Sequence, residues 1–319
     1  MKRDVLDIDY DKEIERISAW MKQAVVRKLR RRGVVVAMSG GIDSSVCAAL
    51  AVRALGPSHV FGLLMPETDS SADSADRATV LAKFLGIEFT LQNIAPTLEP
   101  IGCYKWRDDA IRSVFPEYGA GWANKIVIAG GLEGGFNHFR LVVRSPAGEM
   151  KEAVLQHKAY LQIVAAQNFK QRIRKTLEFF HADRLNYAVV GTPNLLEHDQ
   201  GFFVKNGDGS ADLKPIAHLF KTQVYGLARH MKLPPVICNA TPTTDTYSLP
   251  QGQDEFYFAL PYAQMDLALW AYNHKLPASE LAEALEISVE RAEAVYRDIV
   301  AKRATATILS MRPLGVDEV

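Results

Sequence analysis

The sequence predicts an α/β fold, in which a doubly wound, mostly parallel sheet is flanked by helices. Short apolar runs alternate with helical patterns through the first 91 residues. Unbroken apolar runs are typical of strands covered on both faces, and strands that alternate with helices imply right-handed crossovers. The composition, 48% hydrophobic and 23% charged, is that of a globular protein with a sizeable core.

The predicted elements of the sheet follow this alternation in chain order. Apolar residues recur every three or four positions over 14–30, which predicts a helix whose end falls at Arg30-Arg31-Arg32-Gly33, with Gly33 in the left-handed position. The remaining predicted elements are strands at 34–38, 60–65, 88–91 and 187–190 and helices at 46–55, 74–85 and 160–181.

Two regions depart from this alternation within a single predicted domain over 1–319. The first is an insertion at about 104–156, where glycines interrupt the pattern, 139–143 resembles a strand and Ala147-Gly148 a turn. It can be a lid, an oligomer contact, a partner site or a plain structural excursion, and its conspicuous side chains are Trp106, Trp122, His138, Arg140 and Arg144. The second is a helical C-terminal part at about 256–319, with helices expected at 261–272, 279–285 and 288–303.

Charge and cysteine content exclude several classes of protein. With 37 basic and 37 acidic side chains there is no general attraction to a polyanion, so we expect no nucleic-acid partner. No apolar run reaches the roughly 18 to 20 residues that span a bilayer, and no signal core follows Met1, so we expect a cytoplasmic protein without membrane contact. Cys47, Cys103 and Cys238 lie far apart and form no CxxC pair, which predicts buried thiols.

The segment 39–45, Ser-Gly-Gly-Ile-Asp-Ser-Ser, lies where a predicted strand ends and a helix begins. Glycines let the backbone approach an anion, and successive N–H groups with the helix dipole hold a pyrophosphate without a lysine. The hydroxyls of Ser39, Ser44 and Ser45 can donate to phosphate, and Asp43 suits Mg²⁺. The GxxxxGK[ST] pattern is absent, so γ-phosphate transfer of the kinase kind is not indicated.

Further polar residues follow the strand that ends at Val190. Thr192 and Glu197 should therefore reach the same carboxyl edge of the sheet as the segment 39–45. There Asp43 and Glu197 could converge on one Mg²⁺ between the phosphates of ATP, and Lys221 could neutralise phosphate charge. Asp208, between two glycines, sits in a turn that could reach a second ligand.

The segment 39–45 resembles the pyrophosphate loop of ATP pyrophosphatases, and a longer pattern resembles the NAD synthetase family of that superfamily. The resemblance covers about 14–303 except the insertion, and it implies an adenine nucleotide α-hydrolase-like fold. Its residues are Asn168, Arg172, Arg174, Gly191-Thr192-Pro193-Asn194, Glu197, 201–209, Asp212, Pro215, Lys221-Thr222-Gln223, Pro242-Thr243-Thr244-Asp245, Gln253-Asp254-Glu255, Tyr262 and Asp266.

The resemblance implies ATP-dependent amidation of deamido-NAD to NAD through an adenylated intermediate, with release of pyrophosphate and AMP. It implies Mg²⁺, ATP as co-substrate and a homodimer. By motif, Asp43, Lys221 and Asp245 would be catalytic, with Asp43 and Glu197 as metal ligands. ATP and pyrophosphate would be bound by Ser39, Gly40, Gly41, Asp43, Ser44, Ser45, Thr192 and Lys221. Deamido-NAD would be bound by Arg172, Lys205, Asp208 and Asp212.

Two features leave alternatives open. The family usually has Thr-Lys-Tyr where this chain has Val204-Lys205-Asn206, so a different carboxylate substrate is an alternative. A tRNA-modifying ATP pyrophosphatase and a non-catalytic nucleotide-binding protein are further alternatives. The 319 residues are filled by the synthetase pattern and leave no room for an amidase domain, so we expect ammonia, used directly or delivered by a separate glutaminase.

Overall fold

The computed structural model describes residues 4–129, 138–240, 247–249, 257–258 and 260–316. Its larger sheet is parallel, with strand order β3-β2-β1-β7 and Val34 paired with both Val60 and Ala188. The strands are β1 (Val34–Ala37), β2 (Val60–Leu64), β3 (Glu88–Leu91) and β7 (Ala188–Val190). The predicted doubly wound parallel sheet is confirmed, each strand to within one residue.

Helices cover both faces of this sheet because the strands bury side chains alternately on each side. Val34 and Val36 pack against α1, α2, α3 and α8, whereas Val35 packs against α4 and α6. The helices around the sheet are α1 (Tyr10–Lys22), α2 (Ile42–Leu55), α3 (Ala72–Leu85), α4 (Ala95–Ile101), α6 (His157–Leu185), α7 (Leu195–Gln200), α8 (Lys221–His230) and α9 (Pro235–Cys238), with a short η2 (Pro57–His59) before β2.

The end of the first helix differs from the prediction. After α1 the chain forms a π-helical turn, η1 (Gln23–Lys28), and Arg30, not Gly33, takes a positive φ of 54°. Gly33 is required for another reason, since a Cβ there would lie 2.3 Å from the carbonyl oxygen of His59. Three- and four-residue periodicity cannot distinguish an α-helix from one that widens in its last turns.

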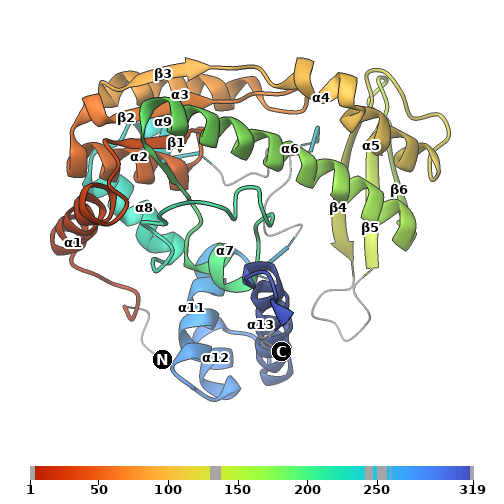
Figure 1. Cartoon of the computed structure of the whole chain (residues 1–319). Coiled ribbons are helices and arrows are strands. Elements are labelled where there is room, and N and C mark those ends of the chain that lie inside the picture. The colour runs from red at the N-terminus through yellow and green to blue at the C-terminus, as the bar shows by residue number, and fades with distance from the viewer. Residues whose placement is uncertain (1–3, 130–137, 241–246, 250–256, 259, 317–319) are drawn as a thin grey trace.

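The insertion is a helix followed by a small antiparallel sheet of order β4-β5-β6. These elements are α5 (Cys103–Arg112), β4 (Ala123–Ala129), β5 (His138–Arg144) and β6 (Met150–Val154). The predicted strand at 139–143 lies within β5, and the predicted turn at Gly148 joins β5 to β6 with a φ of 87°. Figure 1 shows this sheet beside the N-terminal half of α6, far from the parallel sheet.

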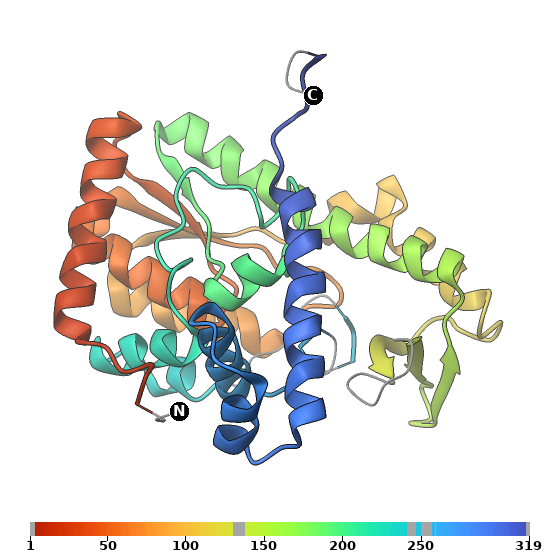
Figure 2. The same cartoon turned by 90° about the horizontal axis from the view of Figure 1, so that it is seen from below.

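The helical C-terminal part is also present. Its helices α11 (Tyr262–Asn273), α12 (Ala278–Leu285) and α13 (Val289–Ser310) share an apolar core with Leu196 of α7. Figures 1 and 2 show them grouped on one side of the molecule, apart from the β4-β5-β6 sheet. Within the described ranges, none of the helices is both long and apolar enough to cross a membrane.

The three thiols are free in the structure, and the prediction that they are buried is confirmed for Cys47 and Cys103 but wrong for Cys238. Cys47 and Cys103 are buried, while Cys238 is partly exposed. Burial is the first cause that raises the pKa of Cys47 well above its ordinary value, and the nearby carboxylates of Asp43 and Glu197 add to it. A thiol held protonated in this way is a packing residue and not a nucleophile.

Candidate active site

A cavity of about 770 Å³ runs from the carboxyl edge of the parallel sheet along α6. At one end, here called the sheet end, it is lined by Ser39, Gly41 and Asp43. At the other, here called the insertion end, it is lined by Phe139 and Tyr160. Its wall along α6 is formed by Tyr160, Val164, Gln167, Asn168, Gln171, Arg174, Lys175 and Glu178. Helix α13 contributes Asp298, Ala301, Lys302, Thr305 and Leu309 to the opposite wall.

The loop between β1 and α2 is held in one shape by its own contacts. Gly40 has a φ of 75°, and a Cβ there would lie 2.3 Å from the backbone oxygen of Ser74, so only glycine fits. Arg77 Nε donates to the Gly40 carbonyl oxygen at 3.1 Å. The Gly41 N–H donates to Ser39 Oγ at 3.3 Å. The loop thus presents Ser39 and Gly41 to the cavity just ahead of a helix N-terminus, where an anion is stabilised.

The serines that begin α2 divide between the cavity and the core. Both Ser44 Oγ and Ser45 Oγ donate to the carbonyl oxygen of Gly41, at 3.1 and 2.7 Å. Ser44 lines the cavity, whereas Ser45 is fully buried behind it. Of the predicted phosphate-binding residues in this loop, Gly40 and Ser45 therefore shape the loop and lie behind the cavity wall, while Ser39, Gly41, Asp43 and Ser44 line it.

Lys221, at the start of α8, reaches two carboxylates from other helices. Its Nζ donates to Asp43 Oδ2 and lies 3.7 Å from Glu197 Oε1. Only 2% of the Lys221 side chain is exposed. Asn194 Nδ2 donates to the second oxygen of Asp43 at 3.1 Å. The structure therefore brings together Asp43 and Glu197, which the sequence placed at one sheet edge, and Lys221, which the sequence predicted to neutralise phosphate charge.

Burial and mutual proximity change the acidity of this group. Burial, together with the neighbouring charge of Asp43, raises the pKa of Glu197 to about 8, although Lys221 acts in the opposite direction. Burial by itself would lower the pKa of Lys221, but Asp43 and Glu197 outweigh it and raise that pKa. The ammonium form of Lys221 is thus the stable one, and it supplies a fixed positive charge at the sheet end.

Contacts at the N-terminal ends of α7 and α8 hold Glu197 and Lys221 in position. Glu197 belongs to a capping box at the start of α7: its N–H donates to Asn194 Oδ1 at 3.1 Å, and the Asn194 N–H donates to Glu197 Oε2 at 3.3 Å. At the start of α8, the Thr222 N–H donates to Asp266 Oδ2 of α11 at 2.8 Å. The ring of Tyr262 lies 5.0 Å from Lys221 Nζ, within the range of a cation–π contact.

The residues predicted to bind the second substrate do not all line the cavity. Thr192 and Asp208 line the cavity, and Asp208 Oδ1 accepts a hydrogen bond from the Val204 N–H at 2.7 Å. Arg172 and Lys205 are exposed: Arg172 Nε donates to the carbonyl oxygen of Lys205 at 3.2 Å. Both lie outside the set of residues that line the cavity.

Asp212 has a structural contact that sequence reasoning missed. Its Oδ2 accepts a hydrogen bond from the Val189 N–H of β7 at 2.7 Å. Asp212 therefore continues the pairing of the sheet at this edge, beside a bridge between Val190 and Leu213. The predicted catalytic residue Asp245 lies outside the described residues.

Other cavity residues were not singled out from the sequence. Glu178 of α6 lines the cavity and accepts a hydrogen bond from Lys175 Nζ at 2.6 Å, and burial raises the pKa of Glu178. Gln167 lines it about three turns further toward the N-terminus of α6. A signal was available in the sequence, since polar residues recur at helical spacing on one face of the long predicted helix.

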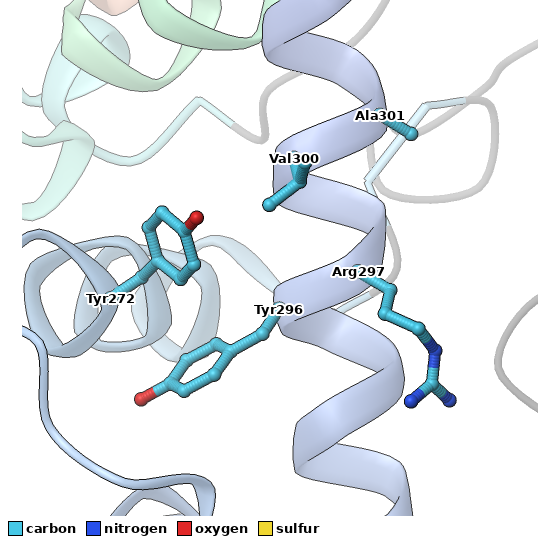
Figure 3. A pocket seen from close by; sticks show the side chains of 5 residues that line it. All are labelled: Tyr272, Tyr296, Arg297, Val300 and Ala301. Carbon is cyan, nitrogen blue, oxygen red and sulfur yellow. The ribbon is translucent and has the colours of Figure 1, made fainter.

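A second, shallower pocket of about 320 Å³ lies between α11 and α13 (Figure 3). Its lining consists of Tyr272, Tyr296, Arg297, Val300 and Ala301. The rings of Tyr272 and Tyr296 meet edge to face with centroids 5.3 Å apart. None of the residues predicted to be functional lines this pocket, so the larger cavity is the candidate active site.

Two carboxylates that could contribute to a metal site, Asp43 and Glu197, lie at the sheet end. Within the described part of the chain, no group of three or more His, Cys, Asp and Glu side chains is placed to hold a metal ion by itself. Asp43 and Glu197 are two carboxylates that share Lys221 as a partner. One or two carboxylates completed by substrate phosphates is the usual way in which Mg²⁺ is bound.

Comparison with known proteins gives a consistent result. The NAD synthase family model matches residues 13–110 and 139–304. The NH(3)-dependent NAD(+) synthetase of Rhizobium meliloti (strain 1021) is 52% identical over 317 residues, which cover 99% of this chain and 95% of that protein. The corresponding enzyme of Thermotoga neapolitana is 34% identical over 291 residues, 88% of this chain and 94% of that protein.

Among solved structures, the NMN synthetase of Francisella tularensis has a TM-score of 0.66 at 20% identity, with 97% of this chain and 99% of that chain covered. The NH3-dependent NAD synthetase of Campylobacter jejuni has a TM-score of 0.60 at 20% identity, with 97% and 100% covered. At this identity the structural similarity establishes the fold alone. The unmatched residues 111–138 fall in the insertion.

Proposed function

The chain belongs to the NAD synthase family, and on that premise we propose that the large cavity is its active site, with ATP at the sheet end. The chain is a ligase that forms a carbon–nitrogen bond in ammonia-dependent NAD synthesis, from ATP, deamido-NAD and ammonia. The observation that carries the proposed site is the buried ammonium of Lys221 between Asp43 and Glu197, directly behind the loop at residues 39–41.

The first step of the proposed reaction is adenylation. An oxygen of the nicotinate carboxylate attacks the α-phosphorus of ATP, the bond to the β-phosphate oxygen breaks, and pyrophosphate leaves. The backbone N–H groups of the loop and the hydroxyls of Ser39 and Ser44 bind the leaving pyrophosphate. Lys221 stabilises the negative charge that accumulates on the phosphates, an effect that a preorganised buried cation supplies without reorganisation.

In the second step ammonia attacks the acyl carbon of the mixed anhydride. The bond between that carbon and the AMP oxygen breaks, AMP leaves with the electron pair, and the added nitrogen loses a proton to give the amide. The chain's part in both steps is to align three anionic or polar reactants and exclude water. Thr192, which lines the cavity as Glu197 does, would contact ATP.

The donor set at the sheet end fits Mg²⁺. Asp43 and Glu197 would hold the ion together with phosphate oxygens of ATP, and when bound it neutralises phosphate charge. Burial is the first cause that raises the pKa of Glu197, and the nearby charge of Asp43 adds to it, so a divalent cation bound by both carboxylates would favour the charged form of Glu197. The role of Asp245 in catalysis stays a prediction.

We extend the proposal to the assembly. Asp208 lines the cavity, but Arg172 and Lys205 lie on the exposed surface next to it, where they would contact deamido-NAD only in a site completed by a second copy. A homodimer is therefore proposed, and light scattering at working concentration should give twice the monomer mass of 35.4 kDa. A monomer would contradict it. A cytoplasmic location and a separate glutaminase remain predictions from the sequence.

An amide ligase for a different carboxylate is not favoured. The three relatives at 50 to 52% identity are all NH(3)-dependent NAD(+) synthetases. The departures at Val204 and Asn206 therefore do not change the assigned reaction.

The test is a reconstituted reaction. Purified protein is incubated with ATP, Mg²⁺, deamido-NAD and ammonium, and NAD is followed through a coupled dehydrogenase while AMP and pyrophosphate are quantified. We expect equimolar NAD, AMP and pyrophosphate, no product when glutamine replaces ammonium, and loss of product in Asp43→Asn. Product from another carboxylate but not from deamido-NAD would overturn the assignment.

A further inference from the structure

Gln167 is a buried amide in the wall of the cavity. Its side chain is 6% exposed and lines the cavity from α6. Neither Nε2 nor Oε1 has a hydrogen-bond partner within the part of the chain that the structure describes. A buried polar group without a partner costs free energy, so its presence calls for a reason. The terminal torsion of glutamine is broad, so the amide can turn toward a ligand that enters the cavity.

The cavity wall on the N-terminal side of Gln167 is apolar and aromatic, with Val164 about one turn and Tyr160 about two turns before it on α6. Phe139 of β5 and Tyr160 of α6 stack with ring centroids 4.0 Å apart and planes inclined by 17°. Both rings are partly exposed and line the cavity, together with Ile128 and Val164. A flat aromatic surface in a cavity is suited to the stacking of a heterocyclic base.

The chemistry of an amide selects among possible rings. Glutamine presents a donor and an acceptor side by side, which pair with two adjacent positions of opposite kind. Adenine offers such an edge, with the N6 amino group as donor and N7 as acceptor, and Gln binds it through both. A carboxylate offers acceptors alone and would leave Oε1 of Gln167 unpaired.

The position of Gln167 along α6 indicates whether the adenine it would bind belongs to ATP or to deamido-NAD. Gln167 lies eleven residues before Glu178, about 16 Å along the helix axis, and the sheet end holds the phosphates in the proposed function. The nicotinate carboxylate must reach the α-phosphate there. The part of deamido-NAD that extends furthest from its carboxylate is the adenine.

We propose that Gln167, with the stacked rings of Phe139 and Tyr160, forms the subsite that recognises the adenine of deamido-NAD, a specificity determinant built partly from the insertion. This inference rests on the proposed function. It gives the insertion a role: β5 supplies one of the two rings of the platform.

The experiment compares three substrates in two variants and a control. Gln167→Leu removes both hydrogen-bonding atoms, and Gln167→Glu keeps the shape but removes the donor. Gln162→Leu is the matched control, because Gln162 lies exposed on the same helix and does not line the cavity. The KM of each protein is measured for ATP, for deamido-NAD and for deamido-NMN, which lacks the adenosine part and serves as a competitive inhibitor if it is not turned over.

We expect Gln167→Leu and Gln167→Glu to raise the KM for deamido-NAD about tenfold, with the constants for ATP and deamido-NMN unchanged. The control should match the wild type throughout. Since Gln167 has no hydrogen-bond partner among the described residues, Gln167→Leu should be no less resistant to denaturant than the wild type.

Other outcomes overturn the inference in distinguishable ways. A rise in the KM for ATP would assign the subsite to the other adenine, and an equal rise for deamido-NMN would assign it to the nicotinate half. Unchanged constants in a folded Gln167→Leu would exclude contact. If the wild type forms no NAD at all, the proposed function fails; if the wild type forms NAD and the variants behave like it, only the adenine subsite fails.

Discussion

At the sheet end of the cavity the charged side chains pair with one another, whereas toward the insertion end the cavity wall carries two stacked rings and an amide without a partner among the described residues. Lys221, Asp43 and Glu197 are already arranged as the proposed reaction requires, and in that proposal they gain from ligands chiefly by sharing charge. Gln167 instead gains its hydrogen bonds when a ligand arrives. Catalysis by charge needs groups fixed in advance, while recognition needs groups left available.

Replacing Lys221 should have the largest effect on stability and activity. Lys221→Met leaves the buried Glu197 and the partly buried Asp43 without their cation, which should destabilise the fold by about 3–5 kcal/mol and lower kcat/KM by at least about a thousandfold. Denaturant unfolding and the NAD assay measure the two effects. Lys83→Met, at an exposed position of α3, is the control and should change neither. A folded, active Lys221→Met would break the claim that this cation is essential to the sheet end.

The next largest effect concerns the shape of the loop. Gly40→Ala should cost about 3 kcal/mol, since the new Cβ combines a positive φ with a collision against the Ser74 oxygen. Gly86→Ala is a matched control, because Gly86 also has a positive φ, of 65°, but open space around it. That control should cost about 1 kcal/mol. Equal losses of unfolding free energy in the two variants would show that the contact with Ser74 does not constrain the loop.

We expect the unfolding free energy to depend on pH through Asp266, which accepts a hydrogen bond from the N–H of Thr222, next to Lys221. Burial raises the pKa of Asp266 to about 6, so the folded protein holds this proton more tightly than the unfolded chain. The stabilisation is complete below pH about 4 and is lost as the pH rises through 6. Asp266→Asn removes this loss, so its unfolding free energy relative to wild type should rise by up to about 3 kcal/mol between pH 4 and pH 7.

Denaturant titrations of both proteins at several pH values measure that difference. A difference that stays constant with pH would mean that Asp266 titrates normally and that the N-terminus of α8 does not depend on a buried carboxyl. Asp266→Asn should keep the hydrogen bond from the Thr222 N–H, since the Asn side-chain oxygen can still accept it.

The smallest expected effect is that of replacing Phe139 at the insertion end. Phe139→Ala removes one ring of the stack with Tyr160, and base stacking of this kind is worth enough for about a tenfold rise in the KM for deamido-NAD. The KM for ATP should not change. Phe84→Ala, at an exposed position of α3, is the control. A rise in the KM for ATP alone would place the aromatic stack in the ATP site and contradict the division between the two ends.

Most of the sheet end could be predicted from sequence because its signals are local. A strand, a Gly-Gly turn and a helix follow one another at 34–55, and parallel strands bring Thr192 and Glu197 to the same edge. The role of Asp212 was missed because its partner is a backbone N–H of β7, which no side-chain pattern reports.

The insertion end could not be predicted in the same way. Its two rings come from β5 and α6, more than 20 residues apart, and meet only through tertiary packing. The π-helical turn at Gln23–Lys28 was also out of reach, since its apolar spacing matches an α-helix. Periodicity reports which face of an element is buried, but not which other element covers that face.

The most direct test of the central claim, that the sheet end activates the carboxylate by adenylation, follows an oxygen label. Deamido-NAD labelled with ¹⁸O in both carboxylate oxygens is converted by the wild-type protein with ATP, Mg²⁺ and ammonium. The ¹⁸O content of each product is then measured by mass spectrometry. The account predicts one labelled oxygen in AMP, one in the amide of NAD and none in pyrophosphate. Unlabelled AMP, or label in pyrophosphate or inorganic phosphate, would contradict it.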